Sequence, residues 1–220
     1  MKRHLHLAAA SLTATATTTV LCIFAFANYP GGTAFASTAH APADLFFCDL
    51  ARASAINGAP NLTSRIAIAV AFVTAVAALV LHVLARWPEL PDGRRRPAAT
   101  LIAMVSMSAT LVLASAADED PSRMHVLGIG LLACSGLPVL VEGLRRARAS
   151  WTKLFFGGTT VVAAGFCFVV YGLVQLELMA LPRALPWGQK VAGLALAAWL
   201  IVENRALLIP SAAEVGLRPD

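Results

Sequence analysis

Apolar residues occur in long continuous runs, without the alternation of half-buried strands or the single apolar stripe of soluble helices. A bilayer with a hydrocarbon core about 30 Å thick needs about 20 apolar helical residues for each crossing. Six runs approach this length, and polar or charged segments separate them. They cover residues 5–27, 66–85, 98–117, 124–141, 154–176 and 186–208. The pattern predicts an all-α fold, a polytopic transmembrane helical bundle with six spans.

Composition supports a membrane protein over a soluble one. Of 220 residues, 58% are hydrophobic and only 13% are charged, whereas soluble domains are about 25% charged. A water-soluble single domain is thereby disfavoured, because too few charged groups remain to cover its surface. Intrinsic disorder is excluded, because it requires low hydrophobicity and high net charge.

The first run has two interpretations. Lys2 and Arg3 precede an apolar stretch that reaches an Ala-Phe-Ala sequence at 25–27, and another follows at 34–36, as in a cleaved signal peptide. The stretch is, however, longer than the roughly 7–15 residues of a signal core. We expect a retained first helix, whose five threonines at 13–19 hydrogen-bond to helix carbonyls or to a neighbouring helix.

The basic residues set the expected orientation. With both termini in the cytoplasm, twelve Lys and Arg residues lie inside and five lie outside, as the positive-inside rule requires. The net charge of +5 therefore reflects topology, and we expect no nucleic-acid partner. Residues 1–210 form a single bundle and 211–220 a cytoplasmic tail. The Ala- and Arg-rich composition indicates a bacterial inner (plasma) membrane, with the protein inserted as a multi-pass protein.

The connection at 28–64 is the long outer loop. Loops of this length are usually functional or disordered, and its apolar Leu45-Phe46-Phe47 segment argues against disorder. We expect the loop to fold back as a cap on the bundle, with Gly58 and Pro60 setting turns.

His125 is the candidate catalytic base at the outer face. It follows Asp118 and Asp120 by a few residues, and a carboxylate can hold the tautomer of a basic histidine. Alternatively, a divalent cation binds Asp49, Asp118, Asp120 and His125 through hard oxygens and one imidazole. In a third interpretation the acidic run only ends the preceding helix and His125 bonds the loop backbone. We expect no other cofactor, because the four cysteines show no metal-ligand spacing.

Other polar residues of the outer face form a candidate ligand-binding set. They are Asp49, Asn57, Asn61, Gln189 and Lys190. Lys190 either receives a lipid phosphate near the headgroups or anchors a helix end by snorkelling.

On the expected inner side, we interpret the polar residues near the span ends as interfacial. We expect His82 to snorkel toward the interface. We expect Glu203 and Arg205 to form an interfacial ion pair, because isolated charges within a span are costly.

The chain resembles the bacterial six-helix membrane proteins of domain-of-unknown-function 998, which are distantly similar to the DRAM-like and GPI-anchor post-attachment families. The matching segments are Phe47-Cys48-Asp49-Leu50, Asn57-Gly58-Ala59-Pro60-Asn61, the acid-Pro-Met-His turn ending at His125, and Gly188-Gln189-Lys190. Where the family pattern has Ser-Asp-Leu-Gly, this chain has Cys48-Asp49-Leu50-Ala51. The resemblance implies six helices, an outward polar cluster and a connection to lipids or lipid-anchored molecules. It implies no particular reaction.

Three functions follow as hypotheses. The first is recognition or remodelling of a lipid or lipid-anchored molecule at the outer face, with membrane lipids as partners. The second is a non-catalytic scaffold, assembly factor or accessory subunit that binds another membrane protein. The third is a small transporter, which the scarcity of charge deep in the spans disfavours.

Overall fold

A computed structural model describes residues 2–36, 41–90, 92–115, 141, 144–145 and 150–209. Throughout these ranges the regular structure is helical, with only two isolated β-bridges, Thr33 with Ala36 and Ser54 with Pro60. Of the five long helices in the described part, four are long and apolar enough to cross a membrane. The all-α membrane architecture predicted from the sequence is confirmed at this level.

The long helices coincide with five of the six apolar runs. They are α1 (Lys2–Ala27), α3 (Leu62–Ala85), α4 (Asp92–Ser115), α6 (Trp151–Gln175) and α7 (Ala184–Leu208). Short turns add η1 (Pro42–Asp44), α2 (Phe47–Leu50) and η2 (Trp87–Glu89). The run at 124–141 lies outside the described residues except for its last position.

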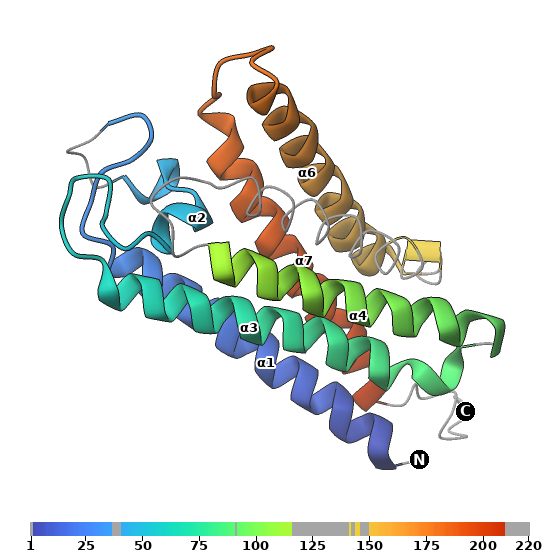
Figure 1. The fold of residues 1–220 in the computed structure, drawn as a ribbon. Coiled ribbons are helices and arrows are strands. Elements are labelled where there is room, and N and C mark those ends of the chain that lie inside the picture. The colour runs from blue at the N-terminus through green and yellow to red at the C-terminus, as the bar shows by residue number, and fades with distance from the viewer. Residues whose placement is uncertain are drawn as a thin grey trace, which may run out of the picture.

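The helices form two inclined groups (Figure 1). In one group α1 runs beside α3, with α4 against the other side of α3; in the other group α6 and α7 pack along each other. The first residues of α1 and the last of α7 lie at one end. We call it the basic end, because Arg86 and Lys153 contact Glu203 there and Arg205 lies in the last turn of α7. The opposite end, formed by residues 28–36, residues 41–61 and the start of α7, is the loop end.

Hydroxyl groups join α1 to α3. The Thr18 and Thr74 hydroxyls lie 2.8 Å apart, and Ser11 Oγ donates to the Ala78 carbonyl at 2.7 Å. The other threonine bonds of α1 run to its own carbonyls, four positions earlier, as at Thr15. The expected use of the threonines, within the helix and across to a neighbour, is confirmed for Thr13, Thr15, Thr18 and Thr19.

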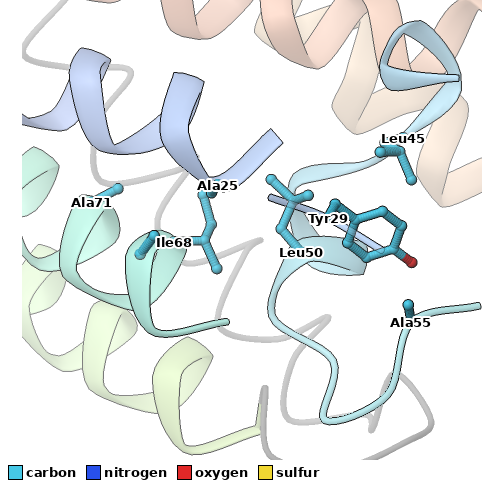
Figure 2. Close-up of a cluster of buried hydrophobic side chains, with 8 residues drawn as sticks. Ala25, Tyr29, Leu45, Leu50, Ala55, Ile68 and Ala71 are labelled. Carbon is cyan, nitrogen blue, oxygen red and sulfur yellow. The ribbon is translucent and has the colours of Figure 1, made fainter. Parts of the chain in front are cut away.

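The described residues of the connection at 28–64 fold onto the ends of α1 and α3, as expected of a cap. Figure 2 shows Tyr29, Leu45, Leu50 and Ala55 gathered beside Ala25, Ile68 and Ala71, and all of these residues are buried. The Tyr29 hydroxyl accepts a hydrogen bond from the Ile56 amide at 3.0 Å. Because these apolar side chains leave water together, the loop has a core of its own.

Glycines make the turns of this cap. Gly31 and Gly58 have φ of 130° and 83°, a region that favours glycine. Asn57 fixes the first turn, since its amide group donates to the Pro30 carbonyl at 3.0 Å and a Cβ at Gly31 would lie 2.9 Å from Asn57 Nδ2.

Candidate functional site

A cavity of about 890 Å³ lies between α1, α3 and α7 beneath the outer loop. Its described lining is apolar for the most part, with aromatic, aliphatic and small side chains. From α1 come Thr18, Cys22, Ile23 and Phe26; from α3, Ile68, Ala71, Phe72 and Ala75; from α7, Gly193, Leu194, Ala197 and Leu200.

Helix arrangement and small residues create this space. Helix α1 packs along both α3 and α7, whereas α3 and α7 contact each other little. Gly193 and Ala197, whose four-residue spacing is typical of helix contacts, line the cavity. Closer contact between α6 and α7 occurs instead at Gly188, where a Cβ would lie 2.8 Å from Cys167 Sγ.

The described part of the loop covers the cavity at the loop end. The Phe47 ring packs edge-on against Phe26 with centroids 5.5 Å apart. Gln189 Oε1 accepts the Phe47 amide at 3.4 Å. Lys190 Nζ donates to the carbonyls of Leu45 at 2.6 Å and Ala43 at 3.0 Å. Helix α7 therefore holds segment 41–51 in place over the apolar space.

Buried polar groups lie at the other end of the cavity. Asn204 Nδ2 donates to Ser11 Oγ at 3.0 Å and to the Leu200 carbonyl at 2.8 Å. Its amide oxygen therefore faces His82 Nδ1 at 3.1 Å, so this ring nitrogen carries the proton. The chain Ser11, Asn204, His82 crosses from α1 through α7 to α3 and ties their basic ends together.

An ion cluster extends from this chain toward the basic end. Glu203 accepts from Arg86, and its other oxygen lies 3.1 Å from Lys153 Nζ. Arg86 also pairs with Glu89 at 2.9 Å. The expected pair of Glu203 with Arg205 is wrong, because Arg205 is exposed and Glu203 turns inward to α3 and α6.

The snorkelling expected of His82 is wrong as well. Its side chain is buried, hydrogen-bonded to Asn204 and packed edge-on against Trp199 at 5.2 Å. A buried amide partner satisfies one ring nitrogen, so the imidazole has a polar environment inside the bundle and does not need to reach the interface.

Asp49 is a structural carboxylate of the loop. Asp49 Oδ2 accepts the Phe46 amide at 3.0 Å, and Oδ1 lies 3.5 Å from Arg52 Nε. Burial raises the pKa of Asp49, while the Phe46 hydrogen bond and the charges of Arg52 and Lys190 oppose this rise. The carboxylate thus stabilises the start of α2.

The two asparagines of the predicted ligand set also serve the loop. Asn61 Nδ2 donates to the carbonyls of Leu50 and Arg52, each at 3.0 Å, while its buried Oδ1 has no partner in the described part. Asn57 bonds Pro30 and the Ala59 amide. Of the five predicted ligand-binding residues, only Gln189 and Lys190 line the cavity among the described positions.

The catalytic hypothesis concerns residues that the structure does not describe. His125, Asp118 and Asp120 lie in the segment 116–140, outside the described residues. Within the described ranges no group of three or more His, Cys, Asp or Glu side chains is arranged to hold a metal ion. Of the four candidate cation ligands only Asp49 falls in those ranges, so catalysis and cation binding both stay predictions.

Arg65 is a cavity residue that the sequence interpretation missed. In the sequence Arg65 is one of the five Lys and Arg residues expected outside, where it indicates only topology, because it precedes the apolar run at 66–85. The structure begins α3 at Leu62 and places Arg65 in the first turn, half-buried, as part of the cavity lining. A basic residue at the outer boundary of a span was the available signal.

The lining has a definite charge. In the described part it contains two cations, Arg65 and Lys190, and no acidic residue. The space is thus apolar along its length with positive charge contributed by α3 and α7.

No protein-family model, curated protein or solved structure matches the chain. The chemistry of the cavity is therefore argued from its own residues.

Proposed function

We propose that this membrane protein binds a lipid, or the lipid portion of a lipid-anchored molecule, at its outer face, with an apolar chain in the cavity between α1, α3 and α7. The observation that carries the proposal is the cavity itself. Its volume of about 890 Å³ falls in the range of roughly 300–1,000 Å³ typical of small-molecule sites.

The depth of the cavity fits one leaflet of a bilayer. Lining residues on α1 extend from Thr15 to Phe26, a rise of about 16 Å at 1.5 Å per residue. Half of a hydrocarbon core of about 30 Å is about 15 Å. An acyl chain of the outer leaflet matches this depth, and the cavity ends near the polar chain of Ser11, Asn204 and His82.

Binding without chemistry accounts for the polar residues at the loop end. Gln189, Lys190 and Asp49 all engage the backbone of segment 41–51, so they position the cover of the cavity. Remodelling of the bound lipid would require His125, with Asp118 or Asp120, to act at the mouth of the cavity. In that case His125→Ala would abolish turnover and leave lipid binding intact.

The proposal includes a topology. We place six spans in a bacterial inner membrane, with both termini cytoplasmic and the loop end outside. The support is the distribution of Lys and Arg together with the shared end of the first residues of α1 and the last of α7. Fusing each terminus to a reporter enzyme that is active only outside the cytoplasm tests this orientation. Both fusions should be inactive, and activity of either fusion would contradict the orientation.

A non-catalytic scaffold is the second candidate. Its specific support is that the loop is ordered by internal bonds of Asn57, Asn61 and Asp49, as a docking surface for another membrane protein requires. Lipid retention distinguishes the two, because a scaffold does not depend on the cavity being open.

A pair of matched glycine substitutions tests lipid binding. Gly193→Leu adds a side chain to the cavity wall, where a Cβ meets only the Phe47 ring at 3.8 Å; Gly165→Leu makes the same change on α6, where a Cβ meets nothing within 4 Å. Native mass spectrometry of purified protein should show most retained lipid lost from Gly193→Leu and normal retention in Gly165→Leu. Equal retention in both variants would contradict the proposal.

A further inference from the structure

We propose that the lipid has an anionic headgroup and that Arg65 is the residue that binds it; this inference rests on the proposed function. The ligand class is an amphiphile whose apolar chain lies between α1, α3 and α7 and whose phosphate or carboxylate lies at Arg65.

Arg65 is available for a ligand in a way that three other described arginines are not. Arg52 lies against Asp49, Arg86 against Glu89 and Glu203, and Arg95 against Asp92. The guanidinium of Arg65 has no ion pair or hydrogen bond to any residue that the structure describes, and the first turn of α3 contains no acidic residue. It is nevertheless half-buried in the cavity wall.

A half-buried cation without a counter-ion favours an anionic ligand. A guanidinium has five N–H donors in a planar fork that matches the oxygens of a phosphate or carboxylate. Desolvation strengthens such a charge-assisted hydrogen bond relative to one in water. The ligand thus supplies the negative charge that the described lining lacks.

Lys190 contributes positive charge but no available donor. Its ammonium has three N–H groups, and it donates to three carbonyls, those of Ala43, Leu45 and Pro186. Headgroup contact therefore falls to Arg65, whose cation favours a lipid with a net negative charge over a zwitterionic one. These roles differ from the sequence-based expectation that Lys190 itself receives a phosphate.

The test compares two lipids with identical acyl chains, phosphatidylglycerol and phosphatidylcholine, on the full chain by native mass spectrometry. We expect the wild type to bind phosphatidylglycerol about tenfold more tightly, equivalent to about 1.4 kcal/mol. Arg65→Gln should bind both lipids equally. Arg65→Lys, which keeps the charge but loses the fork, should retain part of the preference.

Arg183→Gln is the matched control. It removes the same charge at the same end of the bundle, from an exposed residue whose guanidinium lies 5.6 Å from the Phe35 ring and outside the cavity lining. It should preserve the preference. Unfolding temperatures of all variants in detergent show whether each variant is folded. If Arg65→Gln does not fold, the comparison of Arg65→Lys with the wild type provides the test.

The outcomes separate this inference from the proposed function. Equal binding of both lipids by the wild type, or an unchanged preference in Arg65→Gln and Arg65→Lys, would overturn the headgroup assignment and leave chain binding standing. Displacement of the lipid by glycerol 3-phosphate at equal concentration would overturn it too, because the ligand would then be a soluble anion. If the wild type bound neither lipid, the proposed function itself would be overturned.

Discussion

Lys190 Nζ in α7 donates a hydrogen bond of 2.6 Å to the carbonyl oxygen of Leu45, which lies 145 positions earlier in the chain. Through this bond and the one to Ala43, a single ammonium connects the helix that walls the cavity to the loop that covers it. The loop is thereby part of the proposed binding site.

Lys190→Gln should loosen the cover. Buried carbonyls that lose their donor cost about 1–3 kcal/mol, so segment 41–51 should open more often. Alkylation of Cys48 reports this opening. Burial raises the pKa of the Cys48 thiol to about 12, so at pH 8 only about one molecule in 10⁴ carries the reactive thiolate.

We expect Cys48 to be alkylated about tenfold faster in Lys190→Gln than in the wild type, measured by peptide mapping at pH 8. Arg65→Gln is the control, because it removes a cation from the same cavity without touching a loop carbonyl. Equal labelling rates in the wild type and Lys190→Gln would show that Lys190 does not hold the loop.

The stability of Asp49→Asn relative to the wild type should increase as the pH rises. Because burial raises the pKa of Asp49 above 3.8, the folded state holds this proton more tightly than the unfolded state does. The resulting stabilisation is complete below pH about 4 and is lost as the pH passes the raised pKa. An asparagine lacks this dependence and can still accept the Phe46 amide.

The measurement is the difference in unfolding temperature between Asp49→Asn and the wild type, in detergent, from pH 4 to pH 8. Asp44→Asn controls for loss of an acid from the same loop. A constant difference, or one that moves in favour of the wild type at higher pH, would contradict the linkage.

Glu203→Gln should destabilise the basic end. It leaves Arg86 and Lys153 without the carboxylate that both contact, and the cost of breaking a buried pair reaches about 3 kcal/mol or more. Arg205→Gln, two residues along the same helix and exposed, should change stability by less than about 0.5 kcal/mol. Similar unfolding temperatures for the two variants would restore the simple interfacial interpretation of both residues.

Gly31→Ala should be more harmful than Gly58→Ala. Both positions have positive φ, which costs an alanine about 1 kcal/mol or more. The φ of 130° at Gly31 lies farther from the left-handed region open to alanine than the 83° at Gly58, and only at Gly31 does the new Cβ approach Asn57 Nδ2, at 2.9 Å; at Gly58 it meets nothing within 4 Å. The difference between their unfolding temperatures measures the backbone strain and the Asn57 contact at Gly31 together, and no difference would contradict this prediction.

The helices could be predicted from the sequence because a continuous apolar run of spanning length has few other stable structures in a bilayer. The sequence pattern bounds the second span by Arg65 and Arg86, so it predicts a start at 66, although α3 begins at Leu62. Local polarity marks the membrane boundary and not the helix boundary, and this difference concealed Arg65 as a cavity residue.

The contacts within the site depend on how the helices pack. The pattern of apolar and polar residues does not encode this packing. His82 and Asn204 are 122 positions apart, and only the approach of α3 to α7 at the basic end makes them partners. Likewise the sequence predicts Lys190 at the outer face. Its hydrogen bonds to loop carbonyls, however, depend on the path of residues 41–51, which the sequence pattern does not give. The sequence predicts Gln189, Lys190, Asn57 and Asn61 as parts of one ligand-binding set at the outer face. Of these four, the structure places Gln189 and Lys190 in the cavity lining, whereas Asn57 and Asn61 bond within the loop itself.

The most direct test of the central claim, that the cavity holds a lipid chain, is photo-crosslinking with a phosphatidylglycerol that carries a diazirine on its acyl chain. After detergent removes loosely bound lipid, mass spectrometry locates the adducts. We predict adducts on cavity residues of all three walls, such as Cys22, Ala75 and Leu194, and their loss in Gly193→Leu. Adducts confined to outward-facing residues of α6 such as Val162 and Phe168, with none in the cavity, would contradict the claim.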